Sequence, residues 1–198
     1  MAEASEKSAD AAYRAVGRYV VEFSRLIAWQ RLEIEKYLAK DGNLMVPALA
    51  LGAVPAEQIT QSFFAVCEYL AELDEDEKKV ARKLRVEVLE EIKRRNDFAH
   101  GDWLLGTVFE DFPEPVLSRV KPGRKKGAIQ RQSLPIPKIE AAADEVYVLR
   151  QKVAEFGAIC FGTFPVALGQ DGSFRVRHAF KVEGKEVLRI NPAGVNFL

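Results

Sequence analysis

The chain contains little cysteine and little histidine. Its 198 residues include two cysteines, Cys67 and Cys160, and two histidines, His100 and His178, with no Cys-x-x-Cys pair. A structural zinc site needs about four Cys or His ligands at short, paired spacings, so this class of site is excluded. Both cysteines have apolar sequence neighbours, which is typical of reduced thiols in a cytosolic protein.

Net charge and long apolar runs are also missing. The chain has 29 basic and 29 acidic residues, so it does not coat nucleic acid through bulk charge, although a local basic patch stays open. The most apolar run, residues 44–56, is interrupted by Pro47 and Pro55 and is shorter than the roughly 20 residues of a membrane span. The first ten residues are polar, unlike a secretory signal. We expect a soluble, cytoplasmic protein without membrane contact.

Several familiar chemical motifs are absent as well. The sequence has no glycine-rich phosphate loop, no Gly-x-Ser-x-Gly elbow and no His-Glu-x-x-His pair. Its acidic group at 72–77 lacks the spacing and the glycine of a calcium loop. We therefore expect neither a metal nor another cofactor.

Helical periodicity dominates the rest of the sequence. Apolar residues recur at three, four or seven positions over 8–40, 56–73, from about Glu75 to 100–101, and over 138–161. Asp74 with Glu77 has the pattern of a helix N-cap and capping box, so we expect the third helix to begin near Glu75. The four helices predict an all-α fold, an antiparallel bundle of four to five helices. The apolar positions predicted to form its core are Val16, Val20, Phe23, Ile27, Ile34, Leu38, Ile59, Phe63, Val66, Leu70, Leu73, Val80, Leu84, Val88, Ile92, Ile139, Val146, Leu149, Val153 and Phe156.

Prolines and glycines divide the chain further. Five prolines lie between residues 113 and 137, where 116–121 and 128–132 flank a Pro-Gly turn and predict an inserted β-hairpin. The predicted organisation is a helical domain over 1–162, with residues 113–136 as the insertion, and a C-terminal extension over 163–198. This extension is expected to be short irregular or β structure.

One charged residue continues an apolar stripe near the end of the third helix. On a helical wheel Leu84, Val88 and Ile92 share a face, and Arg95 lies in the middle of that face. A buried guanidinium is costly unless it is paired or lines a wet cleft, so Arg95 is a candidate functional residue. His100 follows at the helix end and can exchange a proton near neutral pH. An arginine and a histidine of this kind suit phosphodiester cleavage without metal.

A purely structural role explains the same residues. Arg95 could pair with Glu91 one turn earlier, and His100 could rest against the negative end of the helix dipole with Gly101 as the C-cap. Gln30 interrupts the apolar stripe of the first helix. From its position it is interpreted as a buried hydrogen-bond partner of the Arg-His motif.

The segment Arg95-Asn96-Asp97-Phe98-Ala99-His100 resembles the signature of the HEPN superfamily, in which an arginine and a polar residue precede a histidine at the end of a long helix. The resemblance implies a four- or five-helix fold that dimerises with two motifs facing each other. It also implies a metal-independent endoribonuclease of toxin–antitoxin, phage-defence or RNA-processing type. Arg95 would stabilise the phosphate, His100 would transfer the proton and Asn96 would orient the site. Implied partners are RNA, a second copy of the chain, and an antitoxin or nucleotidyltransferase.

Two features of the chain depart from that family. Its members are often shorter, so the hairpin and the segment after residue 161 are not explained, and no nucleotidyltransferase domain is present in this chain. Other members have lost activity and act as binding, regulatory or dimerisation modules. That role is the alternative function, and a structural helical protein whose motif only caps a helix is a third.

A basic cluster lies in the insertion. Residues 119–131 contain six basic side chains and no acidic one, and the rest of the chain has 23 basic and 29 acidic residues. The cluster is interpreted either as a solvated turn or as a contact to the RNA backbone, and Arg94 adds positive charge at the motif. The candidate RNA-binding residues are Arg94, Arg119, Lys121, Arg124, Lys125, Lys126 and Arg131.

Overall fold

The computed structural model describes the backbone of residues 2–39, 42–71, 73–99, 103–109, 112–122, 129–161, 181–182 and 185–186. Side-chain burial is described for residues 9–39, 42–71, 73–98 and 134–161. His100 and residues 123–128 lie outside the described residues, as does most of the C-terminal extension. The statements below concern the described part of the chain.

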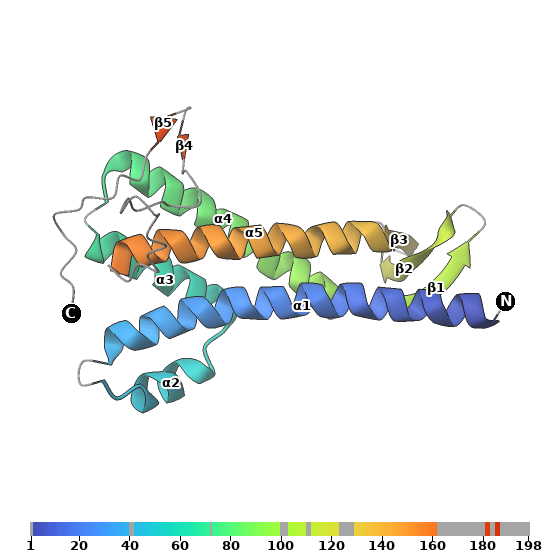
Figure 1. Cartoon of the computed structure of the whole chain (residues 1–198), viewed down its shortest axis with the longest axis horizontal. Helices are drawn as coiled ribbons and strands as arrows, with labels where there is room; N and C mark the ends of the chain where they lie inside the picture. The colour runs from blue at the N-terminus through green and yellow to red at the C-terminus, as the bar shows by residue number, and fades with distance from the viewer. Residues whose placement is uncertain are drawn as a thin grey trace, which may run out of the picture. The chain divides into compact units, whose positions relative to one another are not determined.

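Five α-helices account for most of the described residues, as the sequence predicts for an all-α protein (Figure 1). The helices are α1 (Ala2–Leu38), α2 (Met45–Gly52), α3 (Ala56–Leu70), α4 (Glu75–Ala99) and α5 (Ile136–Phe161). The strands are β1 (Trp103–Phe109), β2 (Phe112–Pro122), β3 (Ile129–Pro135), β4 (Lys181–Val182) and β5 (Lys185–Glu186). The sequence pattern did not predict α2 or β1.

The chain between α4 and α5 forms a three-stranded antiparallel sheet in the order β1-β2-β3. Strands β2 and β3 pair in register from Val116 opposite Pro135 to Pro122 opposite Ile129. Strand β1 pairs with β2 through an irregular register that shifts on both sides of Thr107. Because β3 ends at Pro135 and α5 begins at Ile136, the sheet leads directly into the last helix.

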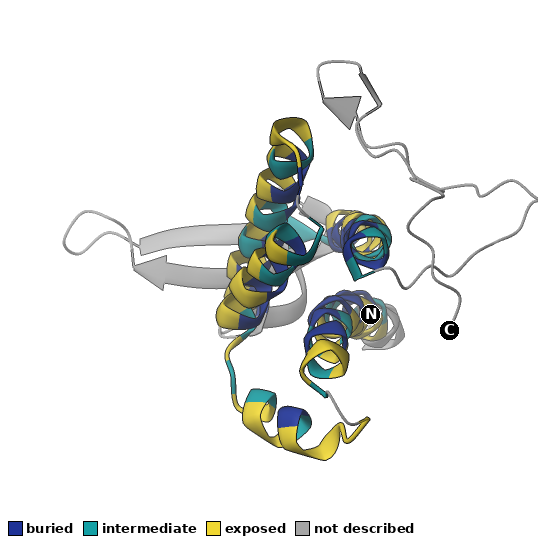
Figure 2. Cartoon of the chain, turned by 90° about the vertical axis from the view of Figure 1, so that its left-hand side faces the viewer, coloured by how far each residue is buried: buried dark blue, intermediate teal, exposed yellow. Residues whose placement is uncertain are grey.

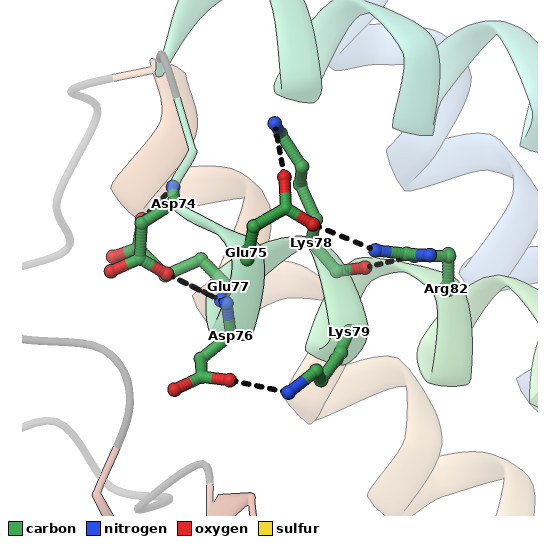
Figure 3. A network of polar contacts seen from close by, with 7 residues as sticks. All are labelled: Asp74, Glu75, Asp76, Glu77, Lys78, Lys79 and Arg82. Carbon is green, nitrogen blue, oxygen red and sulfur yellow. Dashed lines mark hydrogen bonds and ion pairs between the residues drawn. The ribbon is translucent and has the colours of Figure 1, made fainter.

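The first turn of α4 is held by the capping box that the sequence predicts (Figure 3). The backbone N–H of Glu77 donates to Oδ1 of Asp74 over 2.8 Å, and Oε2 of Glu77 accepts from the N–H of Asp74 over 3.0 Å. Asp74 also accepts from the N–H of Asp76. These bonds satisfy backbone donors that a helix start otherwise leaves unpaired, so the start of α4 at Glu75 is fixed by local sequence.

Side-chain ion pairs surround the same turn. Lys78 and Arg82 contact Glu75, and Lys79 contacts Asp76. The hydrogen bond from Lys78 is the main cause that lowers the pKa of the Glu75 carboxyl, followed by the charge of the same lysine. These pairs are solvent-exposed, so their contribution to stability is small.

The chain divides into two compact units that interleave in sequence: residues 1–24 with 93–148, and residues 25–92 with 149–198. The first unit contains the β1-β2-β3 sheet and segments of α1, α4 and α5. Each pair of these helices shares a contact. Tyr19 of α1 packs on Phe98 of α4, Arg94 of α4 pairs with Glu145 of α5, and Arg18 of α1 pairs with Asp144 of α5.

The second unit has an aromatic core. Phe63 of α3 contacts Trp29 of α1, Phe64 of α3 and Phe161 of α5, with ring centroids 5.6, 5.1 and 5.9 Å apart. Phe64 also contacts Phe156 of α5. An aromatic core is stabilised by the burial of large apolar ring surfaces and by favourable edge-to-face and tilted contacts between the rings.

The predicted core positions are largely confirmed. Those of α5 are all buried, as are the four of α4, Val80, Leu84, Val88 and Ile92. Figure 2 shows that the described helices carry both buried and exposed faces. In α1 the buried residues form a helix face that is turned about the helix axis relative to the predicted apolar stripe. Tyr19, Leu26 and Gln30 are fully buried, whereas Leu38, predicted as core, is 49% exposed. Val16, Val20, Val66 and Leu70 are half-buried.

The connection between the first and second predicted helices contains the short helix α2. Pro47 lies in its first turn, where a helix does not need the missing N–H, so proline does not prevent this helix. Met45, Val46 and Leu49 are each at least 67% exposed. In the described part of the chain, no helix has the length and apolar character needed to cross a membrane.

Candidate functional site

The Arg-His motif begins in the last turn of α4. Arg95 is half-buried, Asn96 is exposed and Phe98 is buried, and helix α4 ends at Ala99. Arg95 thus continues the buried face of Val88 and Ile92, as its place on the wheel predicts. His100, the other half of the predicted catalytic pair, lies outside the described residues, so the structure gives no distance between His100 and Arg95.

Contacts to two other helices hold this turn of α4. The rings of Phe98 and Tyr19 lie 4.8 Å apart at 52°, and Tyr19 is fully buried. On the outer side Nη1 of Arg94 donates to Oε2 of Glu145 over 2.8 Å. Arg95 lies between these two anchored residues in sequence. The buried ring contact fixes the end of the helix that carries Arg95, whereas the solvent-exposed pair of Arg94 with Glu145 adds little rigidity.

The guanidinium of Arg95 has no carboxylate partner among the described residues. Its Nη1 donates to the neutral amide oxygen of Asn96 over 3.3 Å, which is a long hydrogen bond. Its Nε is buried and makes no hydrogen bond to the described residues. A half-buried cation without a counter-charge is costly, so retaining it fits a site that receives an anion from outside.

Neighbouring arginines show the contrast. Arg94 is paired with Glu145, and Arg18 is paired with Asp144, and both pairs are exposed to solvent. The charge of Arg94 is therefore partly neutralised within the protein, which weakens its assignment as an RNA-binding residue. Of these three arginines in the first unit, Arg95 is the one whose positive charge is not matched by a described carboxylate.

Two structural roles considered from the sequence are not found in the described contacts. The ion pair of Arg95 with Glu91 is absent, and Glu91, which is 7% exposed, has other interactions. Gln30 is fully buried, but neither its amide nitrogen nor its amide oxygen has a hydrogen-bond partner in the described residues. The prediction that Gln30 hydrogen-bonds the described part of the motif is therefore wrong.

The structure describes the backbone of three of the six candidate RNA-binding residues in the insertion. Arg119 and Lys121 belong to β2, and Arg131 belongs to β3. In the ladder Arg119 is opposite Gln132, and Lys121 is opposite Gln130. Arg124, Lys125 and Lys126 lie outside the described residues. The backbone thus puts three of the six basic positions on two adjacent strands, in the same unit as Arg95.

Sequence reasoning missed the residues that position the motif. Tyr19 of α1 packs on Phe98, and Glu145 of α5 pairs with Arg94, so both contacts come from helices other than α4. Glu22, one turn after Tyr19, is a buried carboxylate at 8% exposure in the same unit. Glu22 and Gln30 are both polar residues on the buried face of α1. The sequence pattern singled out Gln30 and not Glu22.

The chemistry available at this site is anion binding. Arg95 offers planar, permanently charged donors that match a phosphate or carboxylate. Among the described residues no group of three or more His, Cys, Asp or Glu side chains could hold a metal ion. The resemblance of the motif assigns proton transfer to His100, which lies outside the described residues.

Comparisons with protein-family models, with curated proteins and with solved structures found no match to this chain. The function of this chain is therefore inferred from the surroundings of Arg95 and from the resemblance of residues 95–100 to the HEPN signature.

Proposed function

We propose that this chain is a HEPN-like helical-bundle protein with an inserted basic hairpin, and that it is a metal-independent endoribonuclease. The observation that carries the proposal is the half-buried guanidinium of Arg95, which no described carboxylate neutralises. RNA supplies the missing anion through its phosphodiester backbone. The sequence places His100 five residues further on, where the motif requires its proton-transfer group.

In this mechanism Arg95 binds the non-bridging phosphate oxygens and stabilises the charge that develops as the ribose 2′-hydroxyl attacks phosphorus. His100 exchanges the proton of the attacking or the leaving oxygen. Asn96, whose amide oxygen accepts from Nη1 of Arg95, orients the guanidinium. The products are a 2′,3′-cyclic phosphate and a 5′-hydroxyl, so no water and no metal take part in the cleavage step.

The proposed functional form is a homodimer in which Arg95 and His100 of both subunits share one cleft. An antitoxin or a nucleotidyltransferase is the expected regulatory partner. Arg119, Lys121, Arg124, Lys125, Lys126 and Arg131 would contact the RNA backbone beside the site, and this contribution would weaken as salt increases.

The second candidate is a binding module that holds RNA through Arg95 but does not cleave it. It is favoured by one observation: the described contacts of Arg95 include no group that titrates near neutral pH, only the amide of Asn96. Both candidates use Arg95, but only the nuclease needs His100.

The test is cleavage of single-stranded RNA in the presence of EDTA. We expect Arg95→Ala and His100→Ala each to lower the cleavage rate by roughly 100-fold or more. Arg94→Ala is the matched control, because it removes the adjacent charge that Glu145 already pairs, and it should retain most activity. RNA binding without cleavage would support the binding module. Equal activity of wild type and His100→Ala would refute the nuclease.

A further inference from the structure

The two cysteines of the chain, far apart in sequence, meet in the core of the second unit. Cys67 of α3 and Cys160 of α5 are both free, buried thiols, and the Cys160 side chain is near enough to Cys67 to contribute to the raised pKa of that thiol. Ring packing one turn earlier supports the same neighbourhood, because Phe64 of α3 contacts Phe156 of α5. Cys67 follows Phe64 by three residues in α3, and Cys160 follows Phe156 by four residues in α5. Each thiol therefore lies about one helical turn beyond the ring pair.

We propose that Cys67 and Cys160 form an intramolecular redox site that oxidation converts into a disulfide bond between α3 and α5. The proposal is independent of the nuclease function, since neither cysteine belongs to the unit that contains Arg95. It also goes beyond the sequence, which placed each cysteine in an apolar segment but gave no reason to pair them.

The reaction balances with a peroxide as the oxidant. Cys160 is 7% exposed whereas Cys67 is fully buried, so Cys160 is the thiol that a small peroxide reaches first. Sulfur of Cys160 attacks one peroxide oxygen, which forms a sulfenic acid and releases water. The thiol of Cys67 then attacks that sulfur, the S–S bond forms, and a second water leaves. Two thiols are oxidised, and one hydrogen peroxide is reduced to two waters.

The surroundings of the pair make this oxidation slow. Burial raises the pKa of the Cys67 thiol, and the neighbouring Cys160 side chain raises it further, so little thiolate is present in the closed core. Reaction therefore depends on brief local openings of the packing between α3 and α5. Once formed, the bond ties together two helices that the folded chain already keeps adjacent, and it restricts the unfolded chain.

The experiment is treatment of the full-length protein with hydrogen peroxide at low molar excess, followed by mass spectrometry without reduction. We expect an intact chain lighter by two hydrogen atoms, with both thiols protected from alkylation until a reductant is added. The disulfide should raise Tm by on the order of 10 °C, given the long loop that it closes.

Cys67→Ala and Cys160→Ala provide the controls, because each leaves one thiol that cannot close the bond. Neither variant should show the increase in Tm. The mass measurement on the wild-type chain needs no variant, so it stays decisive if a variant folds poorly. The proposal is overturned if the peroxide-treated wild type retains two alkylatable thiols, forms disulfide-linked dimers only, or accumulates sulfinic or sulfonic acid instead.

Discussion

Gly157 of α5 lies directly beneath two aromatic rings of the second unit. A Cβ at this position would lie 2.5 Å from Cη2 of Trp29 and 2.7 Å from Cζ of Phe63. Gly157→Ala should therefore destabilise the protein by about 1–3 kcal/mol, although alanine is normally the better helix former. Urea unfolding measures the change.

Gly17 in α1 is the matched control, because a Cβ there would meet no atom within 4 Å. Gly17→Ala should stabilise the protein by about 0.5–1 kcal/mol through helix propensity. Equal effects of the two substitutions would contradict the close packing described for Gly157.

The raised pKa of the Cys67 thiol gives stability a dependence on alkaline pH. Below about pH 9, the ordinary pKa of a solvent-exposed thiol, Cys67 is neutral in both the folded and the unfolded chain. Above that pH the unfolded thiol ionises while the buried thiol stays protonated, so the free energy of unfolding falls. Between pH 8 and 10 the loss should be about 1.4 kcal/mol relative to Cys67→Ala. A constant difference between the two proteins across that range would contradict the burial of Cys67.

At the scale of single residues, the sequence predicted more of the candidate site than of its surroundings. Arg95 was found because helical periodicity placed a cation on an apolar face, and that placement is confirmed. That no described carboxylate pairs with Arg95 could not be predicted, because pairing depends on residues of other helices. The same limit applies to Cys67 and Cys160, whose contact exists only once α3 and α5 pack together.

Among the helices, α4 has the start that is best determined by local sequence. Asp74→Ala removes the acceptor for the N–H groups of Asp76 and Glu77, so it should cost about 1 kcal/mol of stability. Lys79→Ala breaks an exposed ion pair in the same turn and should cost less than about 0.5 kcal/mol. Chemical denaturation distinguishes the two. A Lys79→Ala cost as large as that of Asp74→Ala would contradict the capping role.

The insertion is the element through which RNA contact can be tested separately from cleavage. Replacing Arg124, Lys125 and Lys126 with glutamine should reduce the slope of log affinity against log salt by about 2 for single-stranded RNA, if all three contact phosphates. Binding titrations at several salt concentrations give this slope. An unchanged slope would make the cluster a solvated turn.

The elements with strong local signals were the predictable ones. The start of α4 was specified by a capping box, and the core faces of α4 and α5 by periodicity. Helix α2 was missed because Pro47 and Gly52 suggested a broken connection, whereas a proline in the first turn leaves a short helix intact. The buried face of α1 differs from the predicted stripe because Glu22 and Glu33 are buried polar residues, which a purely apolar pattern leaves out.

At the scale of the whole molecule, charge is distributed unevenly along a neutral chain. Residues 119–131 carry six basic residues and no acidic one, whereas the rest of the chain carries 23 basic and 29 acidic residues. The pairs of Arg18 with Asp144 and of Arg94 with Glu145 partly neutralise two arginines of the first unit. Among the described residues no carboxylate pairs with Arg95, and we propose that its positive charge binds an external anion. The central claim is that this anion is a phosphate of RNA.

The most direct test of that claim is equilibrium binding of a short 2′-O-methyl RNA, which cannot form the cyclic phosphate, to wild type, Arg95→Ala and Arg94→Ala. The proposed site predicts that Arg95→Ala weakens binding about 10-fold or more, because it removes charge-assisted phosphate contacts. Arg94→Ala should bind within about 3-fold of wild type, because its charge is already paired. Equal affinities of Arg95→Ala and wild type would contradict the claim.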